Sequence, residues 1–329
     1  MSGLQFSSIA QSGPAIEIGL LNNMPDAALH ATEQQFTHLL AAAGGQRAVR
    51  LRFYALPEIP RGEHTRIYMD TLYEGPEQMF EAGLDGLIVT GAEPKTDQLS
   101  GEAYWRGLTE VIDWAQSGVH ASYWSCLAAH AAVQHLDGVR RVRLPSKRSG
   151  VFESERVGDD PMLARLAAPF LTPHSRLNGL DDAELTARGY QILTRSPEAG
   201  VDLFVRRGQS LMVFCQGHPE YDADTLLREY CRDAGRYLCG KRNDPPDLPA
   251  NYLSLRTRGA LAAAARRERD PAVIARYNAI AAMARPKKAW RSSAVGLFRN
   301  WLNQIATRKT ASARLARKTG TPLLGAPAH

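Results

Sequence analysis

The chain has few cysteines, no long apolar run and no glycine-rich nucleotide loop. Four cysteines at irregular spacing in 329 residues make neither a disulfide framework nor a paired zinc motif. No apolar stretch approaches the roughly 20 residues of a membrane span, and the first residues lack the features of a secretory signal. No segment has G-x-G-x-x-G or P-loop spacing, which argues against a nucleotide. These absences predict a cytoplasmic protein with reduced cysteines, no metal, no bound cofactor and no membrane contact.

Acidic residues are missing from the C-terminal part of the chain, and this explains the net charge of +6. Residues 286–329 hold nine Lys/Arg and no Asp/Glu, which leaves 31 basic and 34 acidic side chains in the preceding 285 residues. The body of the protein is therefore mildly acidic, and we expect no nucleic-acid partner. The basic composition of residues 304–329 is typical of a solvated, disordered tail.

Apolar runs alternate with helical patterns through the first half of the chain. This alternation predicts an α/β fold, with a mostly parallel sheet covered by helices on both faces. The expected strands cover residues 16–21, 49–56, 86–91 and 119–125, and the expected helices cover 31–44, 101–118 and 127–138.

The pattern changes after about residue 150, where apolar runs follow one another closely. The runs at 190–195, 201–207 and 210–216 predict an antiparallel extension or a mixed edge of the sheet. A helix follows over 222–240, with Asp222 or Asp224 as its N-cap. The predicted organisation is a tail (1–14), one domain (15–245), a C-terminal extension (246–303) that packs on the core and carries a pair of inserted surface helices (253–285, interrupted at Pro271), and the basic tail (304–329).

Cys126 lies where the strand "VHASYWS" passes into the helix "LAAHAAVQ". At such a turn the side chain stands at the carboxyl edge of the sheet, and the helix N-terminus can lower the thiol pKa and bind an oxyanion. The glycines of the serine-hydrolase motif are missing around Cys126. Taken alone, a buried structural cysteine is an equally good interpretation.

His218 and Glu220 follow the apolar run "SLMVFC" in the stretch "FCQGHPEYDA". Catalytic groups gather at the carboxyl ends of strands in open α/β sheets, so we expect this pair to lie near Cys126. A histidine can accept the thiol proton, and a carboxylate can fix its tautomer and stabilise the imidazolium. The three residues together predict a nucleophile, its base and an orienting acid.

The longer patterns around these residues resemble the homoserine O-succinyltransferase family, a relative of class I glutamine amidotransferases. The resemblance covers most of residues 15–245 and returns near the end, in "LLNNMP", "TEQQF", "DGLIVTGA", "EAYW", "LPSKRSGVFE", "LTPHSR", "GHPEYDADTLLREYCRD" and "AWRSSAVGLFRNWLN". It implies a flavodoxin-like, class I glutamine amidotransferase-like fold. It also implies acyl transfer from an acyl-CoA co-substrate to an amino-acid hydroxyl through a cysteine thioester, in the cytoplasm, by a homodimer.

By this resemblance, Cys126 matches the acyl-thioester nucleophile, His218 the base and Glu220 its orienting acid. The oxyanion of the tetrahedral intermediate is expected to accept hydrogen bonds from the backbone N–H groups of Leu127 and Ala92.

The resemblance also implies substrate-binding roles for Lys147 in "SKRSGVF", Ser175 in "PHSR" and Arg232 in "EYCRD". An arginine can grip a carboxylate through two hydrogen bonds, a lysine adds a point charge, and a serine adds a hydroxyl. Each of them alone would more simply be a solvated side chain, and Glu229 could be a helical i, i+3 partner of Arg232.

Two departures from the family pattern affect the acyl-donor side. Asp26 and Ala27 stand where family members carry lysine after "MP". Lys95 aligns with the position at which acetyl-users of the family have glutamate and succinyl-users have glycine. A lysine there could pair with the free carboxylate of a succinyl group, so Lys95 is expected to favour succinyl over acetyl.

The sequence therefore predicts an O-acyltransferase of methionine biosynthesis that acts on L-homoserine. Acylation of L-serine stays open, as do a glutamine amidotransferase-type hydrolase and a non-catalytic ligand-binding relative. An amidotransferase would need a synthetase domain, for which the C-terminal 80 residues are too few.

Overall fold

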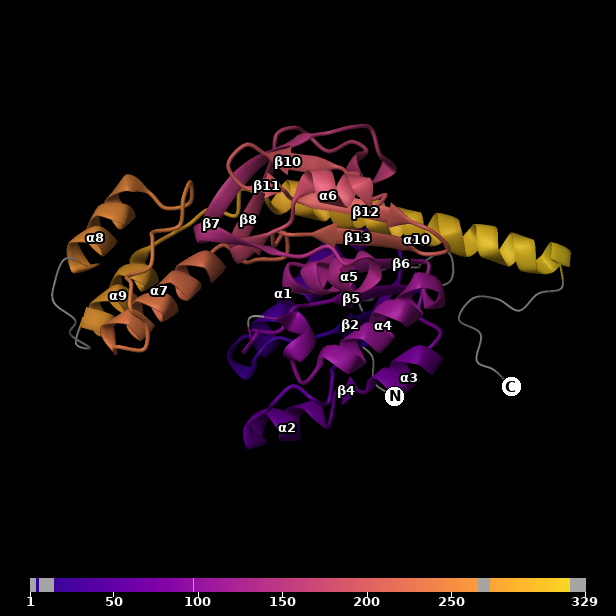
Figure 1. Cartoon of the computed structure of the whole chain (residues 1–329), viewed down its shortest axis with the longest axis horizontal. Helices are drawn as coiled ribbons and strands as arrows, with labels where there is room; N and C mark the ends of the chain where they lie inside the picture. Colours follow the sequence, from indigo (N-terminus) through magenta and orange to yellow (C-terminus); the bar gives the residue numbers. More distant parts are fainter. Residues whose placement is uncertain (1–3, 6–14, 97, 266–272, 320–329) are drawn as a thin grey trace.

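The computed structural model describes residues 4–5, 15–96, 98–265 and 273–319. Its centre is a nine-stranded sheet with the order β1-β3-β2-β5-β6-β13-β12-β9, and β4 pairs with β3 (Figure 1). These strands are β1 (Leu4–Gln5), β2 (Ile16–Leu21), β3 (Val49–Tyr54), β4 (Tyr73–Glu74), β5 (Gly86–Val89), β6 (Ala121–Ser125), β9 (Gln191–Ile192), β12 (Leu203–Arg207) and β13 (Leu211–Cys215).

The middle of this sheet is parallel, as the alternation of strands and helices predicts. Strands β3, β2, β5, β6 and β13 are consecutive parallel neighbours. Strand β12 runs antiparallel to β13 and to β9, so the expected mixed edge is present. The carboxyl ends of β5, β6 and β13 consequently meet at one edge of the sheet.

Helices cover both faces of the sheet, because successive side chains of the strands point to opposite faces. On one face Tyr123 packs with α1 and α10, and on the other Trp124 packs with α3, α4 and α5. The helices are α1 (Asp26–Gly44), α2 (Glu63–Met69), α3 (Pro76–Glu81), α4 (Trp105–Gly118), α5 (Leu127–Asp137), α6 (Asp182–Ala187), α7 (Thr225–Leu238), α8 (Leu255–Ala265), α9 (Val273–Met283) and α10 (Arg291–Thr319), with 3₁₀ turns at Leu99–Gly101 and Pro161–Leu163.

A second, four-stranded sheet has the order β11-β10-β7-β8, from β7 (Val142–Arg156), β8 (Phe170–Gly179), β10 (Thr194–Ser196) and β11 (Gly200–Val201). It is formed mainly by two strands that the sequence did not predict, β7 and β8, while its short strands β10 and β11 overlap the predicted runs 190–195 and 201–207. Strand β7 contains a proline and several charges, and its pairing with β8 shifts register between Arg143 and Arg148. Such a strand lacks the alternation of apolar and polar residues from which a β-strand is predicted in a sequence.

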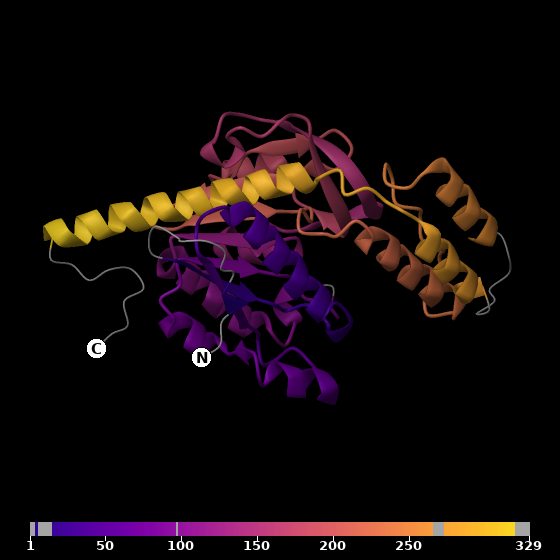
Figure 2. The same cartoon turned by 180° about the vertical axis from the view of Figure 1, so that it is seen from behind.

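The helices expected within 253–285 are present as α8 and α9, while residues 266–272 lie outside the described part. They pack on α7 around a separate apolar cluster that includes Tyr230, Leu261 and Tyr277. Figures 1 and 2 show this three-helix group projecting from one end of the sheet. Asp224 occupies the N-cap of α7, although its side chain makes no capping hydrogen bond.

The disorder predicted for residues 304–329 is wrong for 304–319, which continue α10. The first half of α10 is anchored by buried Trp301 and Ile305, and the Lys309 ammonium donates to Asp85 at 2.7 Å. A basic, alanine-rich composition suits a solvated helix as well as a disordered tail, and only this anchoring decides between them. Residues 320–329 are outside the described range. No helix in the described part of the chain is long and apolar enough to cross a membrane.

Candidate active site

Cys126 occupies the turn between β6 and α5, as the sequence predicts. Its φ of 48° and ψ of −107° place a non-glycine residue in a strained backbone conformation. Its N–H donates to the carbonyl oxygen of Cys215 at 2.7 Å, which ties the turn to the end of β13. This strained strand-to-helix turn presents the half-buried thiol at the carboxyl edge of the sheet.

The loop after β5 lies against the first turn of α5. A Cβ atom added to Gly91 would stand only 2.6 Å from Cβ of Leu127, so nothing larger than glycine fits there. The two predicted oxyanion donors, the N–H groups of Ala92 and Leu127, therefore belong to segments in direct contact beside Cys126. Their action on an oxyanion stays a prediction.

His218 and Glu220 follow β13, which is the parallel neighbour of the strand that ends at Cys126. His218 Nδ1 lies 2.8 Å from Glu220 Oε1, and both side chains are buried. The backbone N–H of His218 donates to the Pro173 carbonyl oxygen at 2.7 Å. The Tyr221 ring stacks on the imidazole, with 4.3 Å between the ring centroids. Because the carboxylate accepts from Nδ1–H, the other ring nitrogen can exchange a proton with the thiol of Cys126, which is within hydrogen-bonding reach.

Charge in this pocket favours the protonated form of His218. Burial alone would lower the pKa of His218, but the Glu220 carboxylate and the Cys126 sulfur outweigh it and raise the pKa well above 6.5. A thiolate–imidazolium pair oriented by a carboxylate is the ground state that a cysteine nucleophile requires.

The structure brings Lys147 and Arg232 together on one carboxylate, that of Asp233. The Lys147 ammonium donates to Oδ2 at 2.8 Å and Arg232 Nε donates to Oδ1 at 3.1 Å. Burial would raise the pKa of Asp233, but Lys147 and Arg232 hold it below its usual value. Ser175 lies on β8 opposite Ser149, two residues along β7 from Lys147. The three predicted substrate-binding residues thus lie on α7 and the neighbouring β7–β8 pair.

Arg232 forms its ion pair with Asp233, while Glu229 accepts a hydrogen bond from the Tyr221 hydroxyl at 2.9 Å. Burial would lower the pKa of Arg232, but Asp233 and Glu229 raise it, so Glu229 interacts with Arg232 and also ties α7 to the ring that covers His218. Asp233 was missed in the sequence, although its place next to Arg232 in "EYCRD" was a usable signal.

The two departures from the family pattern have local explanations. Asp26 accepts from the Gly62 N–H at 2.8 Å and pairs with Arg61 at 3.4 Å, so a cation still lies beside this position. Lys95 is exposed, and its backbone N–H donates to the buried carboxylate of Glu102 at 2.7 Å. Its proposed role in donor choice is not decided by these contacts.

His130 and Gln216 form a further link that the sequence did not indicate. His130 Nε2 lies 2.9 Å from Gln216 Oε1, and the Gln216 amide donates to the Val201 carbonyl oxygen. Burial lowers the pKa of His130 to about 3, so its imidazole is neutral. This contact fastens the helix that follows the nucleophile to the residues that precede His218.

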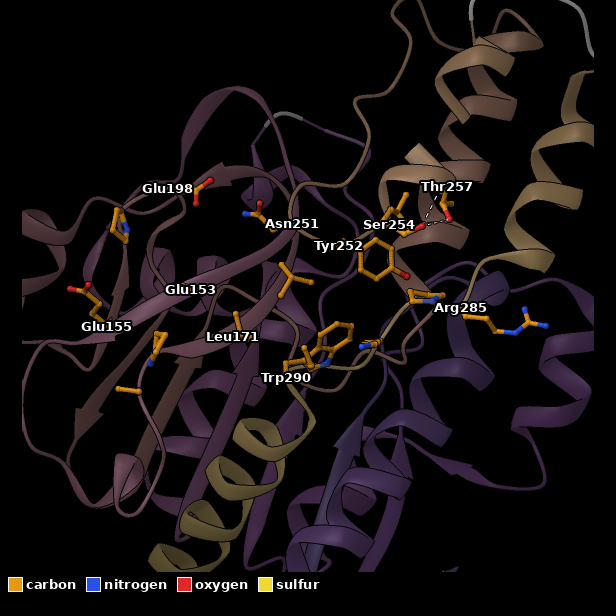
Figure 3. Close-up of a pocket in the computed structure, with 18 of the residues that line it drawn as sticks. Glu153, Glu155, Leu171, Glu198, Asn251, Tyr252, Ser254, Thr257, Arg285 and Trp290 are labelled. Atoms are coloured by element: carbon orange, nitrogen blue, oxygen red, sulfur yellow. Dashed lines mark hydrogen bonds between the residues drawn. The ribbon is translucent and has the colours of Figure 1, made fainter. Parts of the chain in front are cut away.

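A groove of about 1060 Å³ lies between the β7–β8 pair and the start of α8, and it contains none of the predicted site residues. Figure 3 shows Glu155 and Glu198 on its strand side, Ser254 and Thr257 on its helix side, and Trp290 between them. The Trp290 indole donates to the Tyr221 carbonyl oxygen at 3.1 Å. The groove therefore reaches His218 only through Tyr221, whose ring stacks on the imidazole. Although the groove is large, it is not the predicted active site.

The parallel sheet, the strained cysteine turn and the neighbouring His–Glu pair define an α/β protein with a cysteine at the carboxyl edge of its sheet, placed as a nucleophile would be. The profile of the family described as Homoserine O-succinyltransferase matches residues 5–312. The chain is 50% identical over 295 residues to a homoserine O-succinyltransferase of Rhodopseudomonas palustris, with 89% of each chain covered. It is 48% identical over 296 residues to that of Methylorubrum extorquens, covering 89% of this chain and 88% of the relative. The chain belongs to the homoserine O-succinyltransferase family, a family of acyltransferases.

Solved structures with a related arrangement include two glutamine amidotransferases. One from Thermotoga maritima has a TM-score of 0.49 and 12% identity, covering 88% of this chain and 97% of that chain. One from Methylobacillus flagellatus has a TM-score of 0.45 and 12% identity, covering 88% and 94%.

Proposed function

We propose that this protein transfers a succinyl group from succinyl-CoA to the hydroxyl of L-homoserine, through a thioester on Cys126. The observation that carries the proposal is the Cys126–His218–Glu220 arrangement at the edge of the sheet, with its strained nucleophile turn. The relatives named homoserine O-succinyltransferase support the choice of donor and acceptor.

In the first half-reaction the Cys126 thiolate attacks the thioester carbonyl carbon. The oxyanion accepts hydrogen bonds from the backbone N–H groups of Leu127 and Ala92, which lie in two segments that touch each other. The C–S bond to coenzyme A then breaks, and the His218 imidazolium gives its proton to the departing thiolate. The enzyme is left as a succinyl thioester with a neutral imidazole. Because one thioester replaces another, neither half-reaction is strongly uphill.

In the second half-reaction the neutral His218 accepts the proton of the homoserine hydroxyl while its oxygen attacks the enzyme thioester. Collapse of the intermediate breaks the bond to sulfur and restores the thiolate–imidazolium pair. Glu220 keeps Nδ1 protonated throughout, so that the same ring nitrogen handles both proton transfers.

The carboxylate of homoserine is assigned to Arg232 and Lys147, which Asp233 already holds in position. A planar guanidinium can offer two parallel hydrogen bonds to a carboxylate, and an ammonium adds charge. Ser175 on the adjacent strand supplies a hydroxyl to the substrate, and Lys95 adds positive charge on the donor side. A homodimer in the cytoplasm completes the proposal, and sedimentation of the purified protein tests the dimer.

The test is intact-protein mass spectrometry after mixing with succinyl-CoA, acetyl-CoA or a reactive glutamine analogue. We expect one succinyl adduct on wild type, none on Cys126→Ala, and discharge of the adduct by L-homoserine in preference to L-serine. Modification only by the glutamine analogue would indicate an amidotransferase. Absence of all three adducts would contradict a catalytic role for Cys126.

A further inference from the structure

Four cationic side chains surround the single carboxylate of Asp233. Besides Lys147 at 2.8 Å and Arg232 at 3.1 Å, the guanidinium of Arg242 lies 3.8 Å from it and that of Arg236 lies 4.0 Å from it. Asp233 is buried, whereas the three arginine side chains are 33–47% exposed. The buried Asp233 carboxylate therefore neutralises part of the positive charge from the inside, while the arginine side chains are open to solvent on the outside.

The hydrogen-bonding capacity of this cluster is far from filled by Asp233. A carboxylate offers about four acceptor sites, while one ammonium and three guanidinium groups carry roughly 18 N–H donors. Glu93 pairs with Arg236 and Glu229 interacts with Arg232, so the group of four cations and three carboxylates keeps one positive charge. Such an excess of donors and charge is suited to bind anionic groups of a ligand.

Arg236 differs from Arg242 in its link to the catalytic edge of the sheet. Its Nη1 donates to Glu93 Oε1 at 3.3 Å, and Glu93 lies on the loop that follows β5. Two residues earlier, Gly91 contacts Leu127, the residue after the nucleophile. Two residues of extended chain span at most about 7 Å. Through its hydrogen bond to Glu93, Arg236 is therefore held to the part of the loop that lies beside Cys126.

We propose that Arg236 binds the free carboxylate of the succinyl group, so that the cluster accommodates two carboxylates at once. This rests on the proposed function, in which homoserine meets the succinyl thioester and each brings one carboxylate. Lys147 and Arg232 bind the amino-acid carboxylate. The succinyl carboxylate lies three carbon–carbon bonds beyond the thioester carbonyl, about 4 Å when extended, and the loop to which Arg236 is hydrogen-bonded lies beside Cys126. The guanidinium fork can serve Glu93 and the ligand with different N–H groups.

The experiment compares the rates of Cys126 acylation by succinyl-CoA and acetyl-CoA in wild type and in four variants, Arg236→Gln, Arg236→Lys, Arg242→Gln and Lys95→Gln. Arg236→Gln should lower the succinyl-to-acetyl ratio about tenfold, the effect of losing one charge-assisted contact in a partly exposed site. Arg242→Gln is the matched control, since it removes the same charge at nearly the same distance from Asp233, and it should change the ratio less than about threefold. Arg236→Lys should fall between Arg236→Gln and wild type.

Several results would overturn this assignment. An unchanged succinyl-to-acetyl ratio in both Arg236→Gln and Arg236→Lys would do so. An equal fall of this ratio in Arg242→Gln would also do so, because it would indicate that the positive charge of the whole cluster, and not a contact with Arg236, selects the donor. If Lys95→Gln alone abolished the preference, Lys95 would be the carboxylate partner. Failure of wild type to be acylated by either donor would instead refute the proposed function, and this inference with it.

Discussion

Replacing Glu220 by glutamine tests how the imidazole of His218 is charged. Glu220 Oε1 lies 2.8 Å from His218 Nδ1. The change to glutamine preserves the side-chain shape and an oxygen that can accept a hydrogen bond from Nδ1–H, but it removes the negative charge. Since Glu220 helps to raise the pKa of His218 against the effect of burial, that pKa should fall in the variant. The imidazolium that must protonate the departing thiolate is then less stabilised, so acylation of Cys126 should slow.

The size of the effect follows from the distance between the two groups. Opposite unit charges about 4 Å apart attract by up to ~4 kcal/mol at an effective dielectric near 20. The Cys126 sulfur also stabilises the imidazolium and remains in the variant, so we expect about half of this, ~2 kcal/mol. Loss of this stabilisation from the transition state corresponds to acylation about 30-fold slower.

The assay is the rate of succinyl-enzyme formation, followed by rapid quenching and mass spectrometry across the pH range. Loss of the His218 proton sets the alkaline limb of this profile, and in Glu220→Gln the limb should move to lower pH, because the carboxylate that raises the pKa of His218 is gone. His218→Asn serves as the reference for complete loss of the base and should be the slower enzyme. An alkaline limb that stays in place in Glu220→Gln would refute the role assigned to this carboxylate.

The same pair makes a prediction about stability. Because the folded-state pKa of His218 lies above its ordinary value of 6.5, the pair stabilises the folded chain fully below pH 6.5, and this contribution disappears as pH rises through the raised pKa. Glu220→Gln should therefore lower the urea midpoint more at about pH 6 than well above the raised pKa. The reverse order would show that His218 is neutral in the folded protein.

The remaining predictions concern the nucleophile, the donor and the C-terminal helix. Cys126→Ala should abolish turnover with little change in the unfolding midpoint, and residual turnover above background would argue against a covalent intermediate. Lys95→Glu should shift kcat/KM toward acetyl-CoA several-fold, because a carboxylate there repels that of succinyl; an unchanged donor ratio would exclude Lys95 as a selector. Truncation after Thr307 should preserve turnover at saturating substrate but cost about 1–2 kcal/mol of stability, since it removes the Lys309 partner of buried Asp85. Truncation after Thr310 is the control that keeps this ion pair. Equal unfolding midpoints for the two truncated proteins would show that the ion pair does not contribute to stability.

The fold class and the positions of Cys126, His218 and Glu220 could be predicted from the sequence because their signals are local. A buried strand of a parallel sheet is a short apolar run, and its carboxyl end is where polar residues begin. The three residues stand at such ends, and β6 and β13 are neighbours in the sheet.

The second sheet and the full length of α10 could not be predicted in this way. Strand β7 is polar over most of its length, and it forms a strand because it pairs with β8 and β10, which lie further along the chain. The basic half of α10 has the composition of a tail, and what distinguishes it is its continuity with a helix anchored by Trp301 and by the Lys309–Asp85 contact.

By itself, the sequence determined the family and the main sheet and predicted the catalytic residues, because each depends on patterns of a few neighbouring residues. Only the tertiary structure decided which charges meet. Arg232, Arg236 and Arg242 lie on or just after α7 with Asp233, but Lys147 lies 86 residues from Asp233 along the chain and joins them because β7 places it against α7. The strain at Cys126 comes from the packing of its turn, and the pKa of His218 is raised against burial by Glu220 and Cys126, so both depend on neighbours that a local pattern does not specify.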